Sequence, residues 1–284
     1  MKSHPRMGLV FFPKILCAAF ALAAFPCVAL ADFTDPFNTI DPAWVANRYP
    51  PAGFAVNIYD GDSRLKLTID QTGSTANRGT SYSDAFYNIQ GDQRDGGITG
   101  PWTLSAQVYV SSAFNTTTGP LVSSDLWGHT GTTPGGGAYM ILGFTNESPT
   151  APLNPAAADR AFCFRVFDGT TGPAGTWIDL PLPGGFVFDT WHMLSGTSTG
   201  TAFEYRLDGA LVYTVPTVAG NDLLSAMIQG YNFGQPGSYS VYWDNLTASA
   251  IPEPAAGALT ASLAALGLAG WRRRLAATFR GQGR

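Results

Sequence analysis

The sequence predicts an all-β protein whose body, residues 32–250, is an antiparallel β-sandwich. Hydrophobic and polar residues alternate with a period of two along several segments, and glycine-containing breaks separate these segments at short intervals. Gly (33 residues) and Pro (20) are frequent, charged residues make up 13% of the chain and aromatic residues another 13%. Many turns, together with enough aromatic residues to fill a core, are typical of all-β domains and exclude a disordered chain.

The alternation predicts individual strands. It is clearest in residues 64–70, 102–110, 203–208 and 239–244, where every second residue is hydrophobic. Each of these segments should bury one face and leave the other in water. Only residues 222–229 have a helical pattern, and that pattern is short. Asp208-Gly209, between two predicted strands, is suited to a two-residue type I′ hairpin turn.

The N-terminus has the three parts of a secretory signal peptide. A basic segment, residues 2–14, precedes an apolar run from Ile15 to Phe25, and Ala29-Leu30-Ala31 offers a small-residue cleavage site. The alternative, a transmembrane anchor, is disfavoured because the run is short. We therefore expect signal peptidase to remove residues 1–31, between Ala31 and Asp32, and the body to be exported.

The C-terminus has a second targeting pattern, in which Pro252, Glu253 and Pro254 precede the uncharged residues 255–271, and Arg272, Arg273 and Arg274 follow. The uncharged run reaches the lower limit of about 17–25 residues for crossing a bilayer, and the arginines would keep its end in the cytoplasm. Residues 251–274 resemble the PEP-CTERM sorting signal of Gram-negative bacteria. The resemblance implies processing by an exosortase, transient anchoring in the inner membrane through a helix at 255–271, and delivery to the cell surface or extracellular matrix. The basic tail, residues 275–284, is longer than in most members of that family.

The charge of the body restricts its partners. Between Asp32 and Ile251 there are 8 basic and 19 acidic residues, a net charge of −11. Nucleic acid binding requires clustered Lys and Arg, so we expect no nucleic acid partner. Cys163 is the only cysteine in the body, which excludes an internal disulfide. It is either a small residue packed in a strand or a reactive thiol.

The body also resembles a known fold. Trp191-His192, a strand, and then residues 204–212 around Asp208-Gly209 are similar to a stretch of laminin-G-like and concanavalin A-like jelly rolls. Residues 32–44 and the closing segment 242–246 fit the same pattern, in which the first and last strands pair. The resemblance implies a two-sheet jelly roll over nearly the whole body, with another β-sandwich as the alternative.

Jelly rolls of this kind include glycoside hydrolases, which need two carboxylates about 5–9 Å apart. The catalytic strand of those enzymes carries E-x-D-x-E or a close variant, whereas this body has only Glu147 and Glu204, far apart in sequence. Glu204 is interpreted as part of a solvated strand face, and His192 is interpreted as a packed or hydrogen-bonded residue. On this argument the sequence predicts a protein that is not an enzyme.

Two kinds of binding site are predicted in the body. Trp127, His129 and Tyr139, around the glycine-rich segment 128–137, are candidates to contact a polysaccharide, with Trp177 as a further aromatic candidate. Asp60 and Asp62, on either side of Gly61, are candidates for weak Ca²⁺ binding, and residues 92–96 are a second candidate. The alternative for both acidic segments is a solvated turn.

Two function classes remain open at this point. The first is a non-enzymatic surface or matrix protein that binds extracellular polysaccharide. The second is a structural surface protein without a small ligand. A glycoside hydrolase or lyase ranks third.

Overall fold

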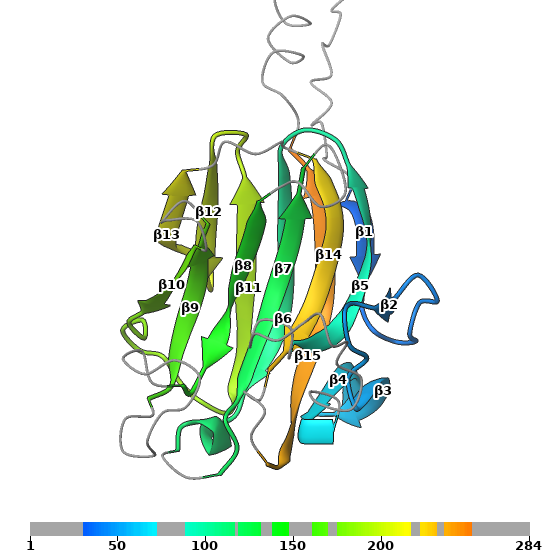
Figure 1. Ribbon diagram of the computed structural model, residues 1–284, viewed down its shortest axis with the longest axis vertical. Helices are drawn as coiled ribbons and strands as arrows, with labels where there is room; N and C mark the ends of the chain where they lie inside the picture. The colour runs from blue at the N-terminus through cyan, green and yellow to red at the C-terminus, as the bar shows by residue number, and fades with distance from the viewer. Residues whose placement is uncertain are drawn as a thin grey trace, which may run out of the picture.

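The computed structural model describes residues 31–72, 89–116, 119–131, 138–147, 161–169, 175–216, 222–231 and 236–251. They form two antiparallel sheets packed face to face, the predicted β-sandwich (Figure 1). The predicted signal peptide, apart from its last residue, and the sorting signal beyond Ile251 lie outside the described residues. In the described part of the chain, no helix has the length and apolar character needed to cross a bilayer.

Sheet A contains eight strands, in the order β13–β12–β11–β6–β15–β4–β3, with β1 paired to β15. Their bounds are β1 Ala31–Asp35, β3 Gly53–Tyr59, β4 Asp62–Asp70, β6 Trp102–Val110, β11 Thr190–Ser198, β12 Ala202–Leu207, β13 Ala210–Pro216 and β15 Ser238–Ala250. Ala31 lies opposite Ser249 and Asp35 opposite Leu246, so the predicted pairing of the first and last strands is confirmed.

Sheet B contains seven strands, in the order β10–β9–β8–β7–β14–β5–β2. Their bounds are β2 Val45–Ala46, β5 Gln90–Ile98, β7 Ser123–Thr130, β8 Tyr139–Thr145, β9 Cys163–Asp168, β10 Thr176–Leu180 and β14 Leu223–Gly230. One short 3₁₀ helix, η2 (Ser112–Phe114), follows β6. The short helical pattern at 222–229 is strand β14, because hydrogen-bonded pairing with β5 and β7 on both sides outweighs local propensity.

The main core lies between the two sheets. The inward residues of β6 are all buried, and so are those of the other segments with predicted alternation. Trp102, Tyr205 and Trp243 are completely buried and are among the largest side chains of this core. Period-two alternation therefore identified the inner face of sheet A correctly.

The predicted hairpin is also confirmed. Asp208 and Gly209 have φ angles of 50° and 82°, as a type I′ turn requires at both central positions. A carboxylate oxygen of Asp208 lies 2.8 Å from His192 Nδ1, and the Val187 carbonyl lies 2.9 Å from Nε2. His192 is buried with both ring nitrogens engaged, so it stabilises the fold, as predicted, and is not placed to act as a base.

Two side chains of β15 cross the sandwich and hold β7. The Tyr239 hydroxyl accepts a hydrogen bond from the Ser123 N–H at 3.2 Å and donates to the Ser123 carbonyl at 2.6 Å. The same hydroxyl accepts from the Tyr231 N–H at 2.9 Å, and Trp243 Nε1 donates to Ser124 Oγ at 3.1 Å. Strand β7 is therefore fixed from the other sheet at its first two residues.

Asp92, on β5 next to β2, gives a testable pH dependence. Burial raises its pKa from 3.8 to about 6. As the pH rises from 3.8 to about 6, Asp92 loses its proton in the unfolded state before it does so in the folded state. The free energy of unfolding therefore falls over this range and is constant above it. Asp92→Asn should therefore raise the free energy of unfolding by about 1 kcal/mol at pH 7, after discounting for partial exposure, and by nothing below pH 3.8. Urea titrations at both pH values measure this, and an equal gain at the two would contradict it.

Candidate functional site

The outer face of sheet B carries a polar and aromatic site. Along β7, Leu126 belongs to the main core, whereas Trp127 belongs to a second hydrophobic cluster on the opposite face of the sheet. The period of two then places Ser123, Asp125 and His129 on the same outer face as Trp127.

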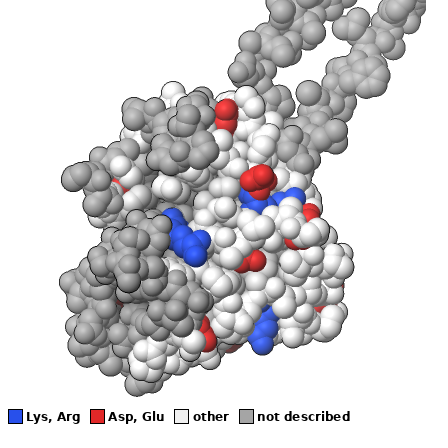
Figure 2. Space-filling model, turned by 45° about the vertical axis from the view of Figure 1, so that its right-hand side comes forward, with Lys and Arg blue, Asp and Glu red and all other residues white. Residues whose placement is uncertain are grey.

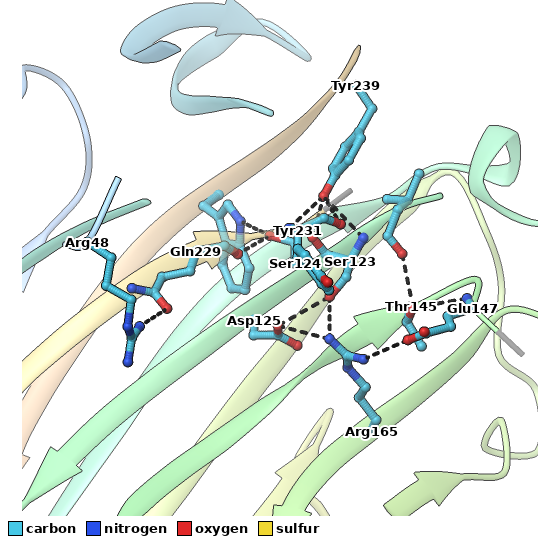
Figure 3. Close-up of polar contacts among 12 residues, drawn as sticks. Arg48, Ser123, Ser124, Asp125, Thr145, Glu147, Arg165, Gln229, Tyr231 and Tyr239 are labelled. Atoms are coloured by element: carbon cyan, nitrogen blue, oxygen red, sulfur yellow. Dashed lines mark hydrogen bonds and ion pairs between the residues drawn. The ribbon is translucent and has the colours of Figure 1, made fainter. Parts of the chain in front are cut away.

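At the centre of this face, two carboxylates contact one guanidinium. Arg165 on β9 approaches Asp125 on β7 at 3.3 Å and Glu147, just after β8, at 3.6 Å (Figure 3). All three residues are buried: the exposed fraction is 2% for Asp125, 5% for Arg165 and 6% for Glu147. Arg165 also donates to Ser123 Oγ at 2.5 Å. Because both carboxylates contact the same guanidinium, the contacting oxygens are no more than about 9 Å apart, so their separation does not exceed that of a glycosidase acid pair.

Burial governs the protonation of these groups. It raises the pKa of Asp125, although the charge of Arg165 and hydrogen bonds from Arg165 and Ser123 oppose the shift. Burial tends to lower the pKa of Arg165, but the charge and hydrogen bonds of Asp125 outweigh it, and the net shift is upward. Arg165 is therefore a permanent cation, whereas Asp125 is a carboxyl group that keeps its proton to higher pH than an ordinary aspartate.

The backbone around Asp125 leaves no spare room. Gly143 on β8 lies opposite Asp125, and a Cβ atom there would come within 3.0 Å of Asp125 Oδ1 and of the Ser124 carbonyl oxygen. Among the described residues, Asp125 Oδ1 has no hydrogen-bond partner. This oxygen is buried against Gly143, so the close packing of β7 and β8 fixes the orientation of the carboxyl group.

The predicted ligand residues Trp127, His129 and Tyr139 do come together. The rings of His129 and Tyr139 stack at 4.7 Å, and Trp127 meets Tyr139 edge to face at 5.8 Å. Two details of the prediction were wrong. His129 lies in strand β7 instead of a glycine-rich loop, and Trp127 is completely buried instead of exposed. Only the half-buried Tyr139 and His129 reach the surface.

Two arginines hold the aromatic residues in place. The Arg48 guanidinium lies 5.2 Å from the Trp127 ring and within 3.5 Å of Gln229 Oε1. Arg48 has a φ of 63°, an unfavourable backbone conformation for a side chain of its size. The Arg165 guanidinium lies 4.0 Å from the ring of Trp177, so Trp177 packs against the same arginine that contacts Asp125 and Glu147.

Burial and the nearby charge of Arg48 lower the pKa of His129. Its imidazole is therefore neutral at pH 7. Cys163, at the start of β9, is half-buried, and burial raises the pKa of its thiol to about 12. The thiol is therefore protonated and unreactive, which favours the packed-residue interpretation over a reactive cysteine.

The proposed calcium ligands lie elsewhere, at the β3–β4 turn of sheet A. Asp60 accepts a hydrogen bond from Trp191 Nε1 at 3.3 Å, and Asp62 forms an ion pair with Arg64 at 3.3 Å. No cluster of three or more His, Cys, Asp or Glu side chains occurs in the described ranges. Calcium binding by Asp60 and Asp62 stays a prediction, as does the alternative at residues 92–96.

The surface shown in Figure 2 carries no basic patch among the described residues. Its Lys and Arg side chains are scattered among acidic and uncharged ones. This distribution is consistent with the acidic composition of the body.

The two-sheet fold is similar to that of two solved proteins. A glycoside hydrolase family 16 protein of the Bacteroides ovatus mixed-linkage glucan system, in complex with a product, superposes with a TM-score of 0.52 and 14% identity, over 76% of this chain and 99% of that one. A family 16 endo-glucanase from Bacteroides ovatus gives a TM-score of 0.50 and 12% identity, over 76% and 99%. No family profile and no curated protein sequence matches the chain. The comparisons therefore show a concanavalin A-like jelly roll.

The prediction of a non-enzymatic protein is contradicted by these comparisons, because the two solved structures named above are family 16 glycoside hydrolases. The physical error is identifiable. The sequence argument required both acids on one strand, in an E-x-D-x-E pattern. The structure instead brings together Asp125 from β7 and Glu147 from the end of β8, through Arg165 on β9. Sequence separation was therefore a poor measure of distance between carboxylates.

Proposed function

We propose that this protein is a glycoside hydrolase that acts on a glycan at the outer face of sheet B. One observation carries the proposal: Asp125 and Glu147 are two buried carboxylates joined by one guanidinium on the central strands of this face. The jelly-roll likeness to family 16 glycoside hydrolases supports the same class of reaction.

The two acids have different roles in this proposal. Asp125, whose pKa is raised by burial, is the general acid that protonates the glycosidic oxygen. Glu147 is the carboxylate that stabilises the positive charge developing on the sugar ring, as nucleophile or as base for a water molecule. Arg165 is a positioning residue that fixes the separation of the two carboxyl groups. The half-buried Tyr139, His129 and Trp177 are the side chains that contact the sugar rings.

The test measures release of reducing ends from purified body, residues 32–250, on neutral β-glucans and on anionic polysaccharides. Asp125→Asn and Glu147→Gln should each lower kcat at least ~100-fold, the usual contribution of a general acid or base. Asp95→Asn, an exposed carboxylate on β5 of the same sheet, is the matched control and should leave kcat unchanged. Wild-type activity should fall as pH rises through the pKa of Asp125. If no polysaccharide is cleaved, or if either variant keeps the wild-type rate, the proposal is rejected.

We also propose that the body is exported and then sorted. The support is the sequence: a signal peptide at residues 1–31, a PEP-CTERM-like signal at 251–274 and its helix at 255–271. Signal peptidase and an exosortase would be the processing partners, and the cell surface or extracellular matrix the destination. Finding Met1 at the N-terminus of the protein isolated from its host, in place of Asp32, would refute export by this route.

A further inference from the structure

A second aromatic surface lies on the outer face of sheet A, on the side of the sandwich away from Asp125. It consists of Tyr59 on β3, Tyr109 on β6, Trp191 on β11 and Tyr242 on β15, and we name it the tyrosine–tryptophan cluster. All four side chains are half-buried, so part of each remains in contact with solvent. They come from four strands and are gathered only by the sheet.

Strand register builds the cluster. Trp191 lies directly opposite Tyr109, and the pairing of Trp243 with Val108 puts Tyr242 on the other side of Tyr109. Tyr59 stacks on Tyr242 at 3.7 Å with an interplanar angle of 12°. It meets Tyr109 edge to face at 4.9 Å, and Tyr109 meets Trp191 at 5.6 Å. The rings therefore hold one another in fixed orientations.

A buried polar group supports the cluster from one side. The Arg64 guanidinium lies 4.8 Å from the Trp191 ring and forms ion pairs with Asp244 and Asp62. Asp244 is only 1% exposed, and its Oδ1 has no hydrogen-bond partner among the described residues. Asp60, at the edge, fixes the indole through Trp191 Nε1. The two aspartates predicted as calcium ligands are thus the rim of an aromatic surface.

We propose that the tyrosine–tryptophan cluster is a second glycan-binding surface, which holds a neutral polysaccharide chain against the face opposite the catalytic site. This proposal rests on the proposed function, because it assigns the same class of polymer to a second surface. Aromatic rings offer flat apolar area to the C–H faces of sugar rings, and phenol groups can exchange hydrogen bonds with sugar hydroxyls.

The charges around the cluster select among ligands. Its rim carries the carboxylates of Asp60 and Asp62, and the body as a whole has a net charge of −11. An anionic polymer would be repelled by both. A neutral chain is not, and it finds acceptors as well as donors at the rim. The surface therefore favours an uncharged glycan over a uronic acid polymer.

The test is affinity electrophoresis of the body in native gels that contain soluble mixed-linkage β-glucan or, separately, alginate. The starting protein is Asp125→Asn, in which turnover is removed and binding can be measured alone. In this background, Trp191→Ala and Tyr242→Ala should each weaken retardation by the β-glucan about tenfold, the loss expected of an interface anchor. Alginate should not retard any form. Ser195→Ala, on the same face of β11, is the matched control.

The outcomes separate this inference from the proposed function. Equal retardation of Trp191→Ala, Tyr242→Ala and the control overturns the second surface but leaves hydrolysis at Asp125 untouched. Loss of binding in these variants, with no hydrolysis by the wild type, supports the surface and rejects the enzyme. Trp191→Phe keeps an aromatic ring and should retain most of the binding. If Trp191→Phe loses as much binding as Trp191→Ala while its melting temperature is unchanged, the result also counts against ring stacking. Preferential retardation by alginate would contradict the assignment to neutral glycans.

Discussion

Replacing Arg165 with methionine is expected to lower the free energy of unfolding by about 3–5 kcal/mol, the usual cost of removing one partner from a buried charged group. Asp125 and Glu147 would remain buried without the cation that contacts both of them. Methionine fills a similar volume, so the loss reports on charge and not on a cavity. The loss should be smaller at pH 4 than at pH 8, because carboxyl groups that keep their protons are less costly to bury.

Urea denaturation of the body, followed by circular dichroism, measures this effect. Adding Asp125→Asn and Glu147→Gln to Arg165→Met should recover a large part of the lost stability, since no unpaired charge remains. Arg206→Met is the matched control, because Arg206 pairs with Glu204 at 3.1 Å on a partly exposed strand face. Such a pair contributes at most about 1 kcal/mol. A loss in Arg165→Met no greater than in Arg206→Met would show that the buried charges do not depend on one another.

Gly143→Ala is expected to destabilise the fold by about 3 kcal/mol and to abolish activity. The added methyl group would approach the Ser124 carbonyl oxygen and Asp125 Oδ1 to less than 3.0 Å. The Ser124 carbonyl is backbone, on a strand fixed by Tyr239 and Trp243, so the clash can be relieved only by moving β7 or β8. A movement of β7 displaces Asp125, and a movement of β8 displaces the strand that leads to Glu147.

The control for this substitution is Gly184→Ala, because an added Cβ at Gly184 meets no atom within 4 Å. Its free energy of unfolding should stay within about ±0.5 kcal/mol of the wild-type value, the range that surface changes produce. Activity and stability of both variants are measured together. If Gly143→Ala melts like Gly184→Ala and hydrolyses at the wild-type rate, then the close packing around Asp125 has no role in the site.

The inner face of sheet A could be predicted from the sequence. Segments such as 102–110 repeat the period of two without interruption, because each is buried on one face and wet on the other. Sheet B was harder. Strand β7 is buried on both faces, so Trp127 and Leu126 are both hydrophobic and the alternation is lost. Strand β14 is buried in the same way, and its sequence therefore looked helical.

The candidate site was predictable only in part. Trp127, His129 and Tyr139 were grouped from the sequence because aromatic residues next to glycines stand out, and β7–β8 pairing does bring them together, whereas their role in ligand binding stays a prediction. Asp125 and Arg165 were missed, because a contact between residues 40 positions apart on β7 and β9 depends on strand order. The polar residues of β7 at positions 123, 125 and 129 were the available signal, since they share one face. The contact of Asp125 with Glu147 through Arg165 could not be predicted without the strand order of the sheet.

Strand β15 is the last strand of the body, yet it lies inside sheet A, where it pairs with β4, β6 and β1. Folding therefore cannot be completed progressively from the N-terminus, because the middle of the sheet is missing until residues 238–250 are available. Pairings between such distant segments also make folding slow, on the order of milliseconds to seconds. The body therefore stays incompletely folded until its last strand has been synthesised, which is the state that the proposed export would require.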